Sequence, residues 1–79
     1  MNQQAIREEI AKLLEVDLSA ITDDLPIAEE SGWDSIVIVS FVAFLMAELN
    51  CRIEIEELMA TPTVGQLWPL LATKISVTP

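Results

Sequence analysis

A run of 12 almost entirely apolar residues, Ile36 to Ala47 with Ser40 its one hydroxyl, limits what this chain can fold into. Such a segment must be buried against other parts of the chain, because exposed apolar surface is unfavourable in water. It is too short to cross a bilayer, which takes about 20 residues. With 79 residues in all, we expect residues 1–79 to form a single domain with one core and no deep catalytic cleft.

The same run has features of both a strand and a helix. Its first part, Ile36 to Val39, is β-branched and typical of a strand. Three observations favour a helix over residues 35–50. Asp34 and Ser35 are both good N-cap types, no turn signal occurs before Asn50, and the second half contains good helix formers.

A helix over this run would divide its side chains between two faces. The larger side chains share one face, which we assign to the core: Ile38, Phe41, Val42, Leu45 and Leu49. The opposite face is mostly uncharged, which is unusual for a face in contact with solvent. It consists of Ile36, Val39, Ser40, Ala43 and Ala47.

The segment before the run predicts another helix. Its apolar stripe has the spacing i, i+4, i+7, i+8 and consists of Ile6, Ile10, Leu13 and Leu14. Asn2 is a suitable cap for this helix, and the pattern ends near Val16. Residues 17–34 then form a long irregular connection, and connections of this length are often functional.

The segment after the run predicts a short helix over residues 56–60 and a last helix. Thr63 and Gln66 fit a capping box for the last helix. Its stripe consists of Val64, Leu67, Leu71 and Ile75. Pro69 cannot donate a hydrogen bond within a helix, so the helix either kinks there or starts later with Pro69 in its first turn. We therefore expect an all-α fold, a small bundle of three main helices plus one short helix, with a long loop between the first and second.

Composition argues against several functions. The net charge is −9, from 13 acidic and 4 basic residues, so we expect no nucleic-acid or membrane partner, whereas a basic protein partner fits. The absence of histidine and the single Cys51, expected to be a partly buried thiol, argue against a metal site and against an enzyme. Residues 17–24 do not fit a calcium loop. The N-terminus lacks the pattern of a signal peptide, so we expect a cytoplasmic location.

Ser35 is the clearest candidate in this chain for a chemical role. It lies where a loop becomes a helix, and the unpaired N–H groups of a first helical turn favour an anion. A phosphate ester on Ser35 would lie in that field. Asp34 could cap the helix or orient a metal-bound donor in a modifying enzyme. Considered alone, however, a serine in this position is most often only an N-cap.

The segment Gly32-Trp33-Asp34-Ser35-Ile36 resembles the attachment motif Gly-x-Asp-Ser-Leu of the acyl and peptidyl carrier protein family. The first helical stripe, the loop with its spaced apolar residues, the helix after Ser35 and the entry Thr61-Pro62-Thr63-Val64 into the last helix resemble that family in order and spacing. The resemblance implies that Ser35 carries 4′-phosphopantetheine, with Asp34 as its motif neighbour. Coenzyme A would supply this arm through a phosphopantetheinyl transferase that binds magnesium.

The resemblance also implies a monomeric carrier that holds acyl groups as thioesters. A loading enzyme would supply them, and a downstream synthase or transferase would accept them. Many fatty-acid carriers have acidic residues on the exposed face after the serine. Here that face has Glu48 as its only acid and otherwise consists of Val37, Ser40, Ala43, Met46 and Ala47. This difference favours a polyketide or related secondary-metabolite pathway.

Two alternatives remain open. One is an aminoacyl or peptidyl carrier of a nonribosomal peptide pathway. The other, of a different class, is a helical interaction module in which Ser35 is never modified.

Other residues have less specific roles. We hypothesise a partner-docking face beside Ser35 made of Ile36, Val39, Ser40 and Ala43; the alternative is that these residues pack under a loop. Trp33 is expected to brace the loop or to touch the arm, and Trp68 to lie in the core or at its rim. The remaining acidic side chains are expected to be solvated: Glu29, Glu30, Glu54, Glu56 and Glu57.

Overall fold

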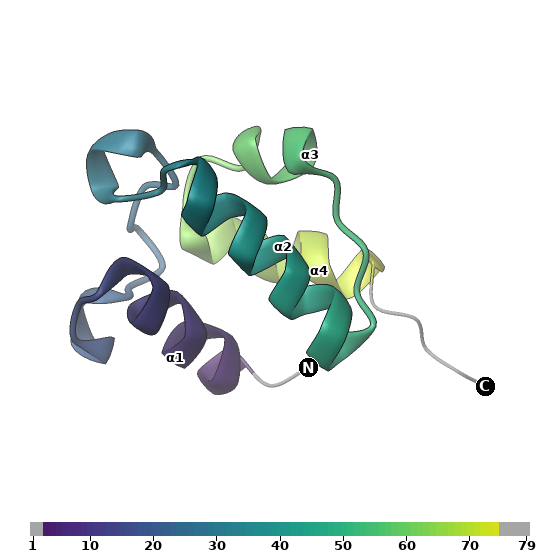
Figure 1. Cartoon of the computed structure of the whole chain (residues 1–79), viewed down its shortest axis with the longest axis horizontal. Helices are drawn as coiled ribbons and strands as arrows, with labels where there is room; N and C mark the ends of the chain where they lie inside the picture. The colour runs from purple at the N-terminus through teal and green to yellow at the C-terminus, as the bar shows by residue number, and fades with distance from the viewer. Residues whose placement is uncertain (1–2, 75–79) are drawn as a thin grey trace.

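The computed structural model describes residues 3–74, and that part of the chain contains four α-helices and no strand. The helices are α1 (Gln3–Leu14), α2 (Ser35–Leu49), α3 (Ile55–Met59) and α4 (Leu67–Lys74), with 3₁₀ turns at Leu18–Ala20, Glu29–Ser31 and Val64–Gln66. α2 runs through the middle of the molecule, with α1 on one side and α3 on the other (Figure 1). The predicted all-α fold is confirmed. Within residues 3–74, no helix combines the length and apolar composition needed to span a bilayer.

The core is built around α2. Phe41 and Leu45 of this helix are completely buried, and Ile38 is almost so. They pack in one cluster with buried side chains from every other α-helix: Ile6 and Ile10 from α1, Leu58 from α3, and Leu67 and Leu71 from α4. The predicted core face of α2 is thus confirmed, with Val42 and Leu49 partly buried at its edges.

Val37 corrects the prediction for the exposed face of α2. We expected this side chain on the solvent side, but it is buried in the core cluster. The reason is that both α1 and α3 contact α2, so the covered part of the helix is wider than one apolar stripe. The exposed face is narrower in consequence.

The ends of the helices follow local backbone signals. α1 ends at Leu14, two residues before the predicted end, because Glu15 adopts a left-handed conformation with φ 58°. Asn50, with φ 50°, ends α2 in the same way. α3 starts at Ile55, one residue earlier than predicted. At this end of the helix, the Glu57 carboxylate accepts a hydrogen bond from the N–H of the preceding residue, Glu54, at 3.0 Å. Two predicted residues, the cap Asn2 and the stripe residue Ile75, lie outside the described residues.

The start of α4 settles the question raised by Pro69. α4 begins at Leu67, so Pro69 lies in its first turn, where a backbone N–H is not needed. The predicted capping box is wrong, because the Thr63 side chain makes no capping hydrogen bond and residues 64–66 form a 3₁₀ turn. Hydrogen bonds to the long loop between α1 and α2 hold this turn in place. The N–H groups of Val64 and Gly65 donate to the carbonyls of Leu25 and Asp23, at 3.0 and 2.8 Å.

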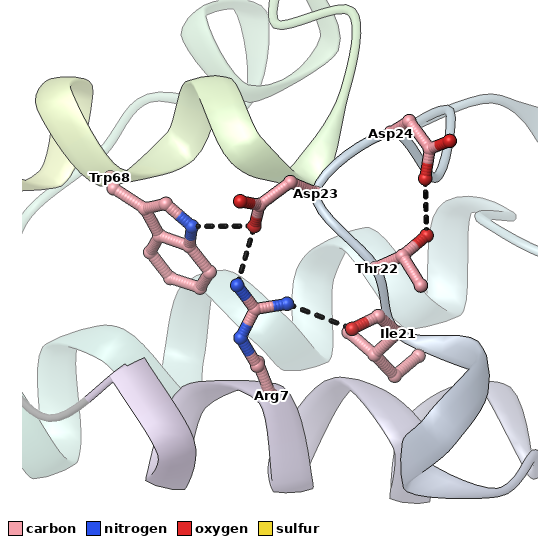
Figure 2. Close-up of polar contacts among 6 residues, drawn as sticks. All are labelled: Arg7, Ile21, Thr22, Asp23, Asp24 and Trp68. Atoms are coloured by element: carbon pink, nitrogen blue, oxygen red, sulfur yellow. Dashed lines mark hydrogen bonds and ion pairs between the residues drawn. The ribbon is translucent and has the colours of Figure 1, made fainter.

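A polar cluster fastens this loop to α1 and α4. Figure 2 shows Arg7 of α1 reaching between Trp68 and the loop. Its guanidinium donates to the Ile21 carbonyl at 2.8 Å and forms an ion pair with Asp23 at 2.5 Å. The Trp68 indole N–H donates to the same Asp23 oxygen at 3.1 Å. The guanidinium also lies 5.0 Å from the centre of the Trp68 ring, within range of a cation–π contact.

The cluster favours the ionised form of Asp23. The hydrogen bond from Trp68, and then the one from Arg7, lower the pKa of this carboxyl below its ordinary value of 3.8. Folding therefore gains stability from the charged carboxylate above pH 3.8. That contribution is lost as the pH falls through the lowered pKa. Trp68 itself is buried at the edge of the core, as predicted.

Gly65 packs so closely on Asp23 that a methyl group has no room. A Cβ at this position would lie 2.8 Å from the Asp23 Cβ and 2.9 Å from its carbonyl oxygen. We predict that Gly65→Ala lowers the free energy of unfolding by about 1–3 kcal/mol, the usual cost of overpacking. Thermal unfolding followed by circular dichroism should show a Tm decrease of about 4–8 °C per kcal/mol.

The exposed neighbour Gln66 provides a matched control for this experiment. Gln66→Ala should change the free energy of unfolding by no more than about 0.5 kcal/mol. A Gly65→Ala protein as stable as this control would contradict the close packing of the loop on the start of α4.

Candidate functional site

Ser35 is the first residue of α2, and its side chain is exposed. The preceding Asp34 has an extended backbone and caps the helix: its carboxylate accepts a hydrogen bond from the Val37 N–H at 2.9 Å. Its carbonyl accepts another from the Ile38 N–H at 3.0 Å. Of the two candidate caps in the sequence, the structure selects Asp34. Ser35 is therefore not needed to cap α2.

The hydroxyl of Ser35 has no hydrogen-bond partner within the described range. The backbone N–H groups of Ser35 and Ile36 also lack partners there. These groups and the positive end of the helix dipole create a favourable environment for negative charge beside the hydroxyl. The site therefore fits a phosphate ester on Ser35, since the oxygen is accessible and the neighbouring amides can accommodate the phosphate charge.

A tight turn and a buried tryptophan set the position of Ser35. Gly32 has φ 98°, a left-handed conformation that strains any other residue, and a Cβ there would lie 3.2 Å from Leu14. Trp33 follows and is only 2% exposed. Its ring contacts Phe41 edge to face, with 5.6 Å between ring centres. Trp33 thus braces the loop, one of the two roles expected for it.

A cavity of about 280 Å³ lies next to Ser35 and is slightly smaller than typical small-molecule pockets, which have volumes of about 300–1,000 Å³. It is formed by the loop before the serine, α2 and α3. Its lining is mainly apolar and consists of Ile27, Ala28, Glu29, Trp33, Ser35, Ile38, Val39, Ile55 and Met59.

The predicted docking residues share one region of α2 with Ser35. Ile36 is 75% exposed and Val39 is 55% exposed, so no loop covers them. Ala43 is also exposed, whereas Ser40 is half-buried. The structure therefore keeps this surface available to a partner.

α3 contributes two apolar residues that the sequence analysis missed. Ile55 is 40% exposed and Met59 is 62% exposed, and both line the cavity beside Ser35. Their i, i+4 spacing on a short helix was the available signal. We refer to Ile36, Val39, Ile55 and Met59 together as the apolar patch.

The remaining candidates have structural roles. Cys51 is completely buried rather than partly so, and burial raises the pKa of its thiol, which opposes nucleophilic chemistry. We had predicted that Glu57 is only solvated, and this prediction is wrong. This glutamate forms an ion pair with Lys74 at 2.7 Å, and the hydrogen bond from Lys74 lowers the pKa of Glu57. Among the described residues, no group of three or more His, Cys, Asp or Glu could hold a metal ion.

Residues 4–68 match the family model described as "Phosphopantetheine attachment site". The chain therefore belongs to this family of carrier proteins. Its members hold covalently bound 4′-phosphopantetheine, have no catalytic activity of their own, and interact with phosphopantetheinyl transferases and synthase enzymes.

The chain is also similar to "Polyketide-8 synthase acyl carrier protein 2" of Streptomyces avermitilis. The two sequences are 26% identical over 78 residues, which cover 99% of this chain and 90% of the relative. The likeness thus spans nearly the whole of both proteins.

Measurements of stability alone can test whether Asp34, and not Ser35, caps α2. We predict that Asp34→Ala lowers the free energy of unfolding by about 0.5–2 kcal/mol, the usual cost of losing an N-cap. Ser35→Ala should stay within about 0.5 kcal/mol of the native chain, because it removes no hydrogen bond. Urea unfolding of both variants would measure the difference. Equal losses in the two variants would mean that Ser35 also caps the helix.

Proposed function

We propose that this protein is an acyl carrier with its 4′-phosphopantetheine attached to Ser35. The observation that carries this proposal is the free, exposed hydroxyl of Ser35 on a helix that Asp34 already caps. A serine needed only for helix capping would use its side chain to accept a backbone hydrogen bond. In a chain of the phosphopantetheine-attachment family, the unused hydroxyl has a direct explanation.

Attachment would proceed at the Ser35 oxygen with the help of a transferase. This oxygen would displace the adenosine bisphosphate part of coenzyme A from the phosphorus nearest the pantetheine, and the hydroxyl proton would be lost. The N–H groups of Ser35 and Ile36 would then lie beside the new phosphodiester. When bound, the arm supplies a thiol that carries acyl groups as thioesters. The chain itself would contribute position, and its partners the chemistry.

The pathway and setting belong to the same proposal. A polyketide pathway is supported by the relative's name and by the scarcity of acidic residues on the exposed face of α2. Residues 1–79 would act as one carrier domain. We also propose that it is monomeric, since its charge of −9 opposes self-association. A cytoplasmic location would suit its free, buried cysteine.

The docking face is proposed to include Ile36, Val39, Ser40 and Ala43, extended by the two apolar residues of α3. The segments that contribute to this region also carry exposed acidic side chains: Glu29 and Glu30 before the serine, and Glu56 on α3. A partner enzyme with an apolar depression and basic residues around it would complement such a surface.

Attachment can be tested by intact-mass measurement. The native chain is incubated with coenzyme A, magnesium and a broad-specificity phosphopantetheinyl transferase. We expect a mass gain of one phosphopantetheine in the native chain and none in Ser35→Ala. Circular dichroism shows whether both chains are folded. A folded native chain that gains no mass would overturn the carrier proposal in favour of an unmodified interaction module. After loading, acyl and aminoacyl loading enzymes can be compared to distinguish the two carrier types.

Docking can be tested by placing a charge in the apolar patch. We predict that Val39→Asp lowers kcat/KM for acyl transfer by a polyketide-type loading enzyme by roughly fivefold or more, equivalent to about 1 kcal/mol, because the residues that contribute most to binding cluster near the centre of an interface. Met46→Asp is the matched control, since this exposed residue lies on the same helix about 10 Å beyond Val39. The docking proposal fails if Val39→Asp and Met46→Asp are loaded at the native rate by every partner enzyme.

A further inference from the structure

The two tryptophans of this chain differ in how their indole N–H groups are satisfied. The Trp68 N–H donates to Asp23 at 3.1 Å. The Trp33 N–H is buried and has no hydrogen-bond partner among residues 3–74. Buried polar groups without partners cost free energy and are uncommon in folded proteins. The Trp33 N–H therefore needs an explanation that the packing of the core does not provide.

The role of Trp33 in bracing the loop does not explain why its N–H is buried without a partner. A phenylalanine at position 33 could make the same kind of edge-to-face contact with Phe41 without burying an unpaired donor. The indole differs from such a ring in size and in its single N–H. A role that uses the N–H would account for the choice of tryptophan.

The location of Trp33 suggests what that role is. Trp33 is one of the residues that line the cavity of about 280 Å³ beside Ser35. A group attached to Ser35 is thus held beside this cavity at a high effective concentration. The other lining side chains are mainly apolar, and the one charged residue, Glu29, disfavours an anion. The cavity therefore suits a short apolar group with one neutral hydrogen-bond acceptor.

We propose that the Trp33 N–H donates a hydrogen bond to a carbonyl oxygen of the group attached to Ser35, and that this oxygen enters the neighbouring cavity. The inference rests on the proposed function, since it requires a group on Ser35. The carbonyl can belong to the arm itself or to its acyl cargo. The indole nitrogen is closed to solvent, so a lining side chain must shift to admit the oxygen. Met59 has this freedom, because it is unbranched and 62% exposed.

The test uses the two indole N–H signals in ¹⁵N–¹H NMR spectra of tryptophan-labelled protein. Trp33→Phe identifies which signal belongs to Trp33, and Trp68 serves as the internal reference. Four forms are compared after their masses are confirmed: unmodified, bearing the arm with a free thiol, butyryl-loaded and 3-oxobutyryl-loaded. Relative to the unmodified chain, we expect the Trp33 proton signal to move downfield in at least one of the three forms that bear the arm, while the Trp68 signal stays in place.

The form in which the signal first moves identifies the acceptor. Movement with the free thiol indicates an amide carbonyl of the arm, movement with butyryl the thioester carbonyl, and movement only with 3-oxobutyryl the keto group of the cargo. Loss of the hydrogen bond in Trp33→Phe should also expose the affected group. Where the acceptor is on the cargo, we expect hydroxylamine to cleave that thioester about 2–10 times faster in this variant.

The outcomes separate this inference from the function on which it rests. A native chain that gains no mass overturns both the carrier proposal and the inference. A fully loaded chain whose Trp33 signal moves no more than that of Trp68, in every form, overturns the inference alone. The carrier proposal would then stand, with Trp33 acting only as a brace.

Discussion

The loop before α2 is tied to two helices through a single carboxylate oxygen of Asp23, which accepts hydrogen bonds from both Arg7 and Trp68. Asp23 lies in the connection between α1 and α2, its partners lie on α1 and α4, and its own carbonyl accepts from Gly65. The rest of this connection is held by Ile21, Ile27 and Trp33, which are buried in the core. Because it leads directly into α2, the cluster that fixes one part of the loop also limits where Ser35 can lie.

The site itself follows from a division of roles between adjacent residues. Asp34 satisfies the start of α2, Trp33 anchors the preceding turn in the core, and Gly32 allows the backbone to reverse direction. Ser35 is thereby left exposed with a free hydroxyl between a packed turn and a capped helix. In the proposed function, a modifying enzyme would meet this oxygen without having to order the loop first.

The sequence predicted the parts of the structure that depend on local pattern. The helices, the core face of α2 and the turn at Asn50 all follow from periodicity and residue type over short distances. The capping box at Thr63 was wrong because the Gln66 N–H, which the Thr63 side chain would have capped, donates to the Thr63 carbonyl instead. The preceding amides of Val64 and Gly65 bond to Leu25 and Asp23 in a distant part of the chain. Val37 was misplaced for a related reason, since a helical wheel gives directions but not how many neighbours surround the helix.

In the candidate site, too, some features follow from local sequence pattern and others depend on how distant parts of the chain pack. The motif drew attention to Ser35, but Asp34 and Ser35 are equally good caps by residue type, and only the backbone conformation distinguishes them. The contribution of α3 to the apolar patch was missed, because it depends on how a five-residue helix is placed against α2. The unpaired N–H of Trp33 could not be foreseen either, since it results from the packing of the whole core.

The apolar patch and the high negative charge are complementary properties of this surface. Four large apolar side chains exposed around one site would favour association between copies of the chain. A charge of −9 on a chain of 79 residues opposes that association through mutual repulsion. At the proposed docking face, the same charge would attract a partner of opposite sign, and the apolar side chains would then be buried at contact. Charge would thus select which proteins approach, and the apolar patch would hold the one that fits.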